Sequence, residues 1–136
     1  GHCGDYNTGV GWASLGDPTL YGNEVNSPGP RNVGVGPYTL RLISSSAATR
    51  NTAVGSNAGW NMGSGGNNTL IGAYAGDNLK TGSYNILIGD SSGTGITSGS
   101  NNTIIGANIT NANGYSNSTA IGYQANITNN NQCWSP

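Results

Sequence analysis

The sequence predicts an all-β protein, a parallel β-roll or β-solenoid of about seven rungs in a single repeat domain over residues 1–136. A short motif that closes with Gly recurs seven times and begins with Asn in six of the seven copies. No window carries the apolar stripe of an amphipathic helix. More than half of the residues are Gly, Asn, Ser or Thr, yet the few large apolar residues recur at fixed positions. Such ordered spacing distinguishes a repeat protein from a disordered chain of similar composition.

The repeat is clearest in the glycines that close each motif. These are Gly11, Gly36, Gly55, Gly72, Gly89, Gly106 and Gly122, and from Gly55 onward they are almost evenly spaced. Units this short cannot bury an apolar face alone, so we expect them to stack as parallel strands about 4.8 Å apart. Identical positions then form ladders. The expected ladders are an amide ladder of Asn51, Asn68, Asn85 and Asn102, and a hydroxyl ladder of Thr52, Thr69, Thr103 and Thr119 that Ile86 interrupts.

The regularity of the repeat divides the domain into three parts. Residues 7–50 form irregular N-terminal rungs with an inserted loop at 16–31, residues 51–128 carry regular repeats of nearly constant length, and residues 129–136 form a C-terminal cap or tail. The inserted loop is either a binding loop or a structural cap. A three-sided solenoid of hexapeptides is an alternative fold. It fits one hexad at 71–76, but the next two hexads would bury Asp77 and Ser83.

Both faces of the central strands are apolar. Consecutive residues of a strand point to opposite sides, so one apolar column fills the roll and the other needs a cover. We expect another copy of the chain to supply it, because a Leu or Ile left in water forfeits roughly 1.5–3 kcal/mol. Which column faces the oligomer axis stays open at this point. The predicted core and interface residues are Val54, Leu70, Ile71, Leu87, Ile88, Ile104, Ile105 and Ile121.

Three repeats, at residues 51–58, 68–75 and 117–125, resemble the head repeats of YadA-type trimeric autotransporter adhesins. Similar repeats occur in phage tail fibres and in surface proteins of large algal viruses. The resemblance covers 51–128 well and 7–36 loosely. It implies a left-handed parallel β-roll, a homotrimer along the roll axis, and attachment to a host cell, matrix or cell-wall glycan. Longer, Asn-rich repeats and two cysteines depart from the bacterial pattern and favour a viral fibre or spike.

The predicted function is therefore a non-enzymatic host-attachment module, on a virion surface or extracellular, that binds a cell-surface polysaccharide. A bacterial adhesin head at the cell surface and a purely structural fibre shaft are the alternatives. Every aromatic residue is Trp or Tyr, and rings with a polar group suit wet positions where sugars bind. Packing of these rings between rungs is the competing interpretation. The candidate carbohydrate-binding residues are Trp60, Tyr74, Tyr38, Tyr123, Trp12 and Tyr21.

Composition argues against several other classes of protein. With four basic and five acidic residues and a net charge of -1, the chain offers no field for nucleic acid. It has no apolar run near the roughly 20 residues of a membrane-spanning helix, so we expect no membrane insertion. His2 is the only histidine, so we expect no catalytic triad, metal or cofactor.

Asp77 and Asp90 are the one carboxylate pair that a polysaccharide depolymerase could use, although solvated turn positions explain both more simply. Cys3 and Cys133 flank opposite ends of the array, too far apart for an intrachain disulfide, which needs Cα atoms within about 7 Å, unless a tail folds back. Free thiols or pairing between chains remain.

Overall fold

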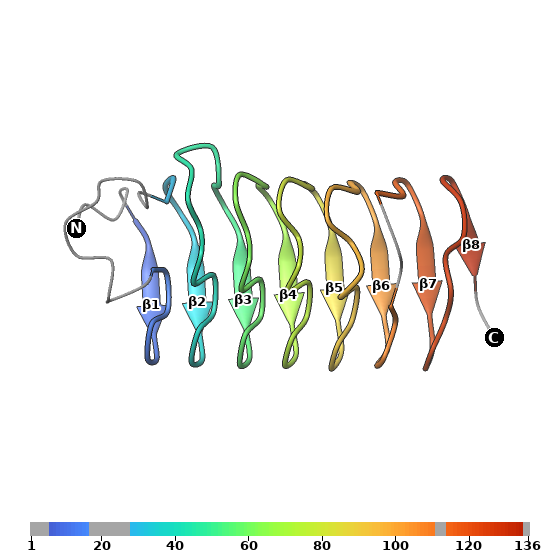
Figure 1. Ribbon diagram of the computed structural model, residues 1–136, viewed down its shortest axis with the longest axis horizontal. Coiled ribbons are helices and arrows are strands. Elements are labelled where there is room, and N and C mark those ends of the chain that lie inside the picture. Colours follow the sequence, from blue (N-terminus) through green and yellow to red (C-terminus); the bar gives the residue numbers. More distant parts are fainter. Residues whose placement is uncertain (1–5, 17–27, 111–113, 135–136) are drawn as a thin grey trace.

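A single row of parallel strands runs the length of the computed structural model (Figure 1). The structure describes residues 6–16, 28–110 and 114–134. Eight strands pair in chain order in one sheet. They are β1 (Thr8–Val10), β2 (Val33–Val35), β3 (Thr52–Val54), β4 (Thr69–Ile71), β5 (Ile86–Ile88), β6 (Thr103–Ile105), β7 (Thr119–Ile121) and β8 (Cys133–Trp134). The described ranges contain no helix, so the all-β parallel solenoid is confirmed.

The solenoid makes about five turns instead of the predicted seven. Strands β2 to β7 are linked by five in-register pairings, and the turns between them have nearly equal length. The chain between β1 and β2 includes residues 17–27, which lie outside the described residues. Thr119 of β7 pairs with Cys133 of β8, a partner closer along the chain than in any earlier turn, so the last unit is short. The closing glycines therefore outnumber the complete turns.

Tight corners, not further strands, carry the chain from one strand to the next. Within the described ranges each turn contributes one strand to one sheet, which argues against the three-sided alternative. The closing glycines explain the first bend, since their φ angles run from 119° to 146°, a region that L side chains rarely adopt. A Cβ on Gly55 would also lie 2.6 Å from the carbonyl oxygen of Gly72 in the next turn.

The structure settles which apolar column is the core. The middle residue of each strand from β3 to β7 points into the roll, and Leu70, Leu87 and Ile104 have no exposed surface. The opposite wall of the interior comes from the corners and loops. Its large members are Leu40, Ile43, Met62, Leu79, Ile96 and Ile109. The column that includes Val54, Ile71 and Ile105 therefore faces outward, and the expected core and interface residues separate into two groups.

The predicted asparagine ladder is present and buried. The Nδ2 of Asn68 donates to Asn51 Oδ1 at 3.0 Å and to the carbonyl of Gly82 at 3.0 Å. Its Oδ1 accepts from the backbone N–H of Asn85 at 3.0 Å and from Asn85 Nδ2 at 3.1 Å. The same pattern links Asn32, Asn51, Asn68, Asn85 and Asn102. From Asn32 to Asn85 each side-chain amide uses both donors and accepts two hydrogen bonds, so its burial costs little. The register also confirms the threonine ladder that Ile86 interrupts.

Candidate functional site

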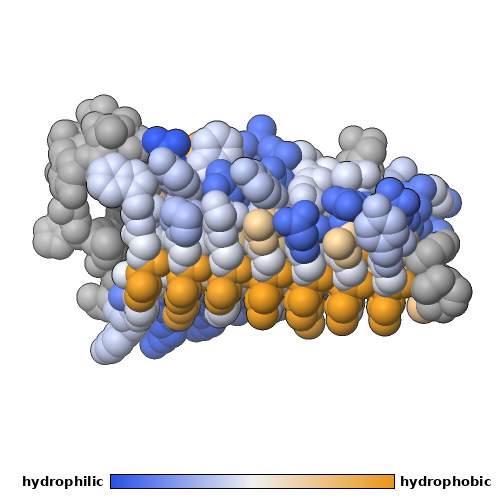
Figure 2. All heavy atoms as spheres, turned by 90° about the horizontal axis from the view of Figure 1, so that it is seen from below, coloured by the Kyte–Doolittle hydropathy of each residue, from blue (hydrophilic) through white to orange (hydrophobic). Residues whose placement is uncertain are grey.

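The first candidate site is an apolar stripe on the outward side of the sheet. It consists of the third residue of each three-residue strand, namely Val10, Val35, Val54, Ile71, Ile88, Ile105 and Ile121. These residues form a continuous row along the roll in Figure 2. Six of them are between 37% and 57% exposed, and Ile88 is half-buried. First strand positions, mostly threonines with Ile86 among them, run beside the stripe.

An apolar row of this length is a surface to be covered. Large contiguous apolar patches on soluble proteins usually mark interaction sites. Full burial of a Val or Ile is worth about 1.5–3 kcal/mol, so covering the exposed part of each stripe residue yields about 1 kcal/mol. Over the whole stripe this amounts to about 7 kcal/mol per chain. This free-energy gain is comparable to the lower estimates of the translational and rotational free energy that two chains lose when they associate.

The second candidate site is the corner that follows the closing glycine, where aromatic and charged side chains gather. We call Tyr38, Arg41, Trp60, Tyr74 and Asp77 the aromatic corner. Tyr38 and Tyr74 hold the same position two turns apart, because Asn57 N–H bonds to the carbonyl of Pro37 and Tyr74 N–H bonds to that of Ser56. Arg41, Trp60 and Asp77 each follow that position by three places in the chain.

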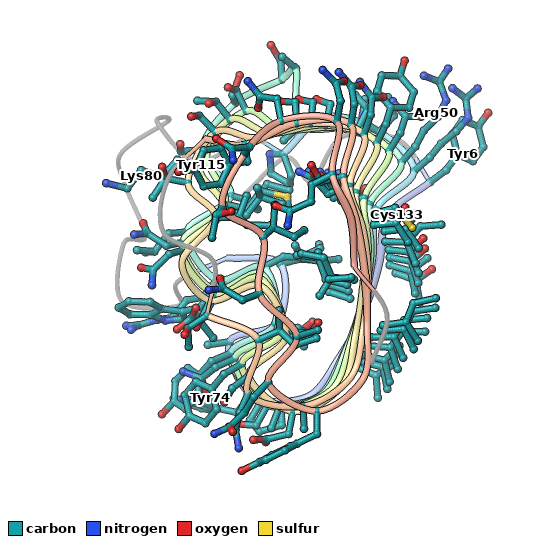
Figure 3. All side chains as sticks on the ribbon, turned by 90° about the vertical axis from the view of Figure 1, so that its right-hand side faces the viewer. Tyr6, Arg50, Tyr74, Lys80, Tyr115 and Cys133 are labelled. Atoms are coloured by element: carbon teal, nitrogen blue, oxygen red, sulfur yellow. The ribbon has the colours of Figure 1, made fainter. Side chains whose placement is uncertain are left out.

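The side chains of the aromatic corner are partly buried and partly open to solvent. Tyr74 is 48% exposed and lies on the side of the roll away from Cys133 (Figure 3). Tyr38 and Trp60 are half-buried. The guanidinium carbon of Arg41 lies 5.4 Å from the centre of the Tyr38 ring, within cation–π range. The corner therefore offers flat ring surface beside a cation.

The two tyrosines occupy a backbone conformation that suits other residues better. Tyr38 has a φ of 59° and Tyr74 of 56°, while Asn57 between them has 59°. The left-handed conformation costs an ordinary L residue about 1–2 kcal/mol, and Asn tolerates it best after Gly. Backbone outliers of this kind cluster at functional sites. The same conformation recurs at this position with Ala13, Ser91 and Gln124, so the corner imposes it on whatever residue stands there, the tyrosines included.

Asp77 supplies the acidic group of the corner. Desolvation by burial raises the pKa of its carboxyl above the ordinary value, and hydrogen bonds from the backbone of Asn78 and of Asp77 itself oppose the rise. Asp90 lies at a different corner position in the next turn, directly after Gly89, where it is exposed and accepts from Ser91 Oγ at 3.2 Å. The two carboxylates therefore do not hold equivalent positions.

The remaining predicted binding residues are spread along the roll. Trp12 is 65% exposed, and its carbonyl accepts from Tyr38 N–H, so it lies one turn before the aromatic corner. Tyr123 is equally exposed but follows β7, far from the corner. Tyr21 lies outside the described residues. Arg41 was not predicted, and Asp77 was considered only as half of a carboxylate pair, although their spacing from Tyr38 and Tyr74 was available in the sequence.

Two other kinds of site are absent from the part of the chain that the structure describes. No three His, Cys, Asp or Glu side chains there group closely enough to hold a metal ion. No helix among the described residues has the length and apolar character to cross a membrane. Cys133 is free and exposed, whereas Cys3 lies outside the described residues.

Comparison with protein-family models, with curated proteins and with solved structures finds no match for this chain. The parallel β-solenoid agrees with the fold class implied by the resemblance to adhesin head repeats. Membership of that family stays a prediction.

Proposed function

We propose that the chain is a non-enzymatic attachment module that assembles as a homotrimer and binds a polysaccharide of a host surface through the aromatic corner. The observation that carries the proposal is the placement of Tyr38, Trp60 and Tyr74 at the corners of three consecutive turns, with Arg41 over the Tyr38 ring. A viral fibre or spike, on the virion surface or extracellular, is favoured over a bacterial adhesin head by the Asn-rich repeats and the two cysteines.

The apolar stripe supports the trimer. It is straight and parallel to the roll axis, so copies with the same orientation can bring their stripes together along their whole length. In a closed cyclic oligomer the apolar stripe of every chain is covered. In an assembly that does not close, the chains at its ends keep an uncovered interface. Three left-handed rolls around a common axis are the arrangement that the resemblance to adhesin heads implies.

The aromatic corner supports the choice of polysaccharide. Sugar rings present C–H faces that stack on Tyr and Trp, and hydroxyl groups that bond to charged and amide side chains. Arg41 supplies donors and Asp77 an acceptor within the same three turns. A row of rings at successive turns suits a polymer, because neighbouring sugar units can contact neighbouring rungs.

The solution mass tests the trimer. We expect light scattering to give about three times the chain mass of 13.7 kDa. The double variant Ile71→Ser with Ile105→Ser should lower it to that of one chain, because both side chains lie in the apolar stripe. Tyr123→Ser, a change at an exposed ring outside the stripe, is the matched control and should keep the mass. A mass of 13.7 kDa for the unchanged chain overturns the trimer.

Glycan binding tests the aromatic corner. The double variant Tyr38→Asn with Tyr74→Asn places at both positions the residue that Asn57 already provides in the turn between them, so it should fold normally. Because it removes two rings of the aromatic corner, it should lose binding to neutral glycans on a glycan array. Tyr84→Asn removes an exposed ring elsewhere and should leave binding unchanged. Absence of binding by the unchanged chain supports the structural shaft instead. If the unchanged chain releases reducing sugar from a polysaccharide, and Asp77→Asn or Asp90→Asn abolishes that release, the protein is a depolymerase. This result would overturn the non-enzymatic proposal.

A further inference from the structure

We propose a second ligand site, formed by Tyr6, Arg31 and Arg50, that binds the carboxylate or sulfate groups of an anionic polysaccharide. We call these three residues the cationic row. The row is separate from the aromatic corner. It depends on the proposed attachment function only in that the ligand is a polysaccharide.

The cationic row is built by the register of the ladder. Its residues directly precede the ladder asparagines Asn7, Asn32 and Asn51 in three successive turns. Arg50 N–H donates to the carbonyl of Pro30 at 3.1 Å, and Asn51 N–H donates to Asn32 Oδ1 at 2.9 Å. These bonds set the backbones of Arg31 and Arg50 one strand spacing apart, about 4.8 Å. Tyr6 and Arg50 point away from the roll at the same edge in Figure 3.

The row concentrates charge in a protein that has little of it. Arg31 and Arg50 are two of only four basic residues, and both are exposed. The guanidinium carbon of Arg31 lies 5.7 Å from the centre of the Tyr6 ring, which orients one of the cations. Asp77 and Asp90, the acids among the described residues, belong to corners after β4 and β5. Two adjacent like charges repel each other, and a bound anion relieves that repulsion.

The backbone gives an independent reason to assign a role to the arginines. Arg31 has a φ of 65° and Arg50 of 58°, while Asn67, Asn101 and Asn117 hold the same position in later turns with φ of 58° to 60°. Asn adopts this left-handed conformation more readily than Arg. Since both arginines are exposed, packing does not compensate for their unfavourable backbone. Their planar head groups instead suit two-point hydrogen bonding to carboxylate or sulfate.

The test uses the asparagine of the later turns as the replacement. The double variant R31N/R50N should keep or raise the thermal stability, because it extends the pattern of Asn67, Asn101 and Asn117. Bacterial expression avoids glycosylation of the sequon that R50N creates. The probes are polygalacturonate for carboxylate, dextran sulfate for sulfate, and neutral dextran as the reference. We expect the affinity for at least one polyanion to fall by about tenfold or more, the effect of losing charge-assisted hydrogen bonds.

Two controls separate the row from general charge effects. Y84N makes the same kind of replacement at the same position in a turn between Asn67 and Asn101, without changing charge. K80Q removes one positive charge from an exposed side chain outside the row. Both controls should retain polyanion binding, and the polyanion that binds more tightly identifies the preferred anion.

The results that overturn the site are equally definite. They are an unchanged polyanion affinity in R31N/R50N, an equal loss in K80Q, or binding of neither polyanion by the unchanged chain. Failure of the aromatic corner has a different signature, because Tyr38→Asn with Tyr74→Asn alters neutral-glycan binding and leaves the cationic row intact. Each site can therefore fail alone.

Discussion

Replacement of Asn85 by Asp in the middle of the ladder probes the fold most directly. The Nδ2 of Asn85 donates to Asn68 Oδ1 at 3.1 Å and to the carbonyl of Gly99 at 2.9 Å, and the side chain has no exposed surface. An ionised carboxylate has the same shape but no donor. N85D therefore places an oxygen atom against two acceptor oxygens, while the bonds from Asn102 to this side chain can remain.

The expected loss of stability is large and depends on pH. A buried acceptor without a partner costs about 1–3 kcal/mol, so two of them cost about 2–6 kcal/mol. This compares with about 5–15 kcal/mol for the total stability of a typical domain. Burial and the two facing oxygens raise the pKa of the introduced carboxyl above the value of about 3.9 in an unfolded chain. The penalty is thus small below that unfolded value and grows as the pH rises through the folded pKa.

Thermal unfolding followed by far-UV circular dichroism over a pH series measures this effect. The control is N101D, the same chemical change at an exposed residue directly before Asn102 of the next turn. N85D should be much less stable than N101D near neutral pH and approach it in acid. Equal stability near neutral pH, or a difference that does not change with pH, would refute the role of the buried amide donors.

Three further predictions concern other parts of the roll. G55A should lower the midpoint of thermal unfolding strongly relative to T97A at an exposed position, because the glycine has a φ of 125° and its Cβ would lie 2.6 Å from Gly72 O. Equal midpoints would contradict the steric argument. D77N should be more stable than the unchanged chain at a pH above the folded pKa of Asp77, because burial raises that pKa and the unchanged chain loses stability as the carboxyl ionises. A stability difference that is constant with pH would contradict it. In a C3S variant, Cys133 should react with a thiol reagent without denaturant, since its side chain is exposed and free. Protection of the thiol until unfolding would show that another surface covers it.

The sequence predicts the ladders and the parallel register well, because a constant repeat length fixes which positions stack. It does not distinguish the interior from the exterior of the strands, because Leu87 and Ile88 are equally apolar. Which of the two columns faces the interior depends on the direction in which the chain bends at the closing glycines. The amino-acid sequence alone does not give that direction. The number of turns is also hidden, since the motif at 7–11 looks complete whether or not a full turn follows.

The candidate sites divide in the same way. Spacing from the closing glycine is sufficient to place Tyr38 and Tyr74 in one column. Arg31 and Arg50 look like isolated charges, because they are far apart in an irregular part of the chain. They become neighbours only when the ladder sets Asn32 beside Asn51. Sites made by register across unequal repeats are therefore the ones that sequence reasoning misses.

The buried ladder also gives the roll a chemical direction. From Asn51 to Asn102 each side-chain nitrogen donates to the side-chain oxygen of the asparagine one turn before it, so these amide groups point the same way along the column. Ser118 takes the next place in the column, where its Oγ accepts from Gln132 N–H at 3.2 Å and donates to the carbonyl of Asn129 at 3.1 Å. A further asparagine turn can join this ladder only in the same orientation, since a turn in the opposite orientation would bring donor against donor or acceptor against acceptor.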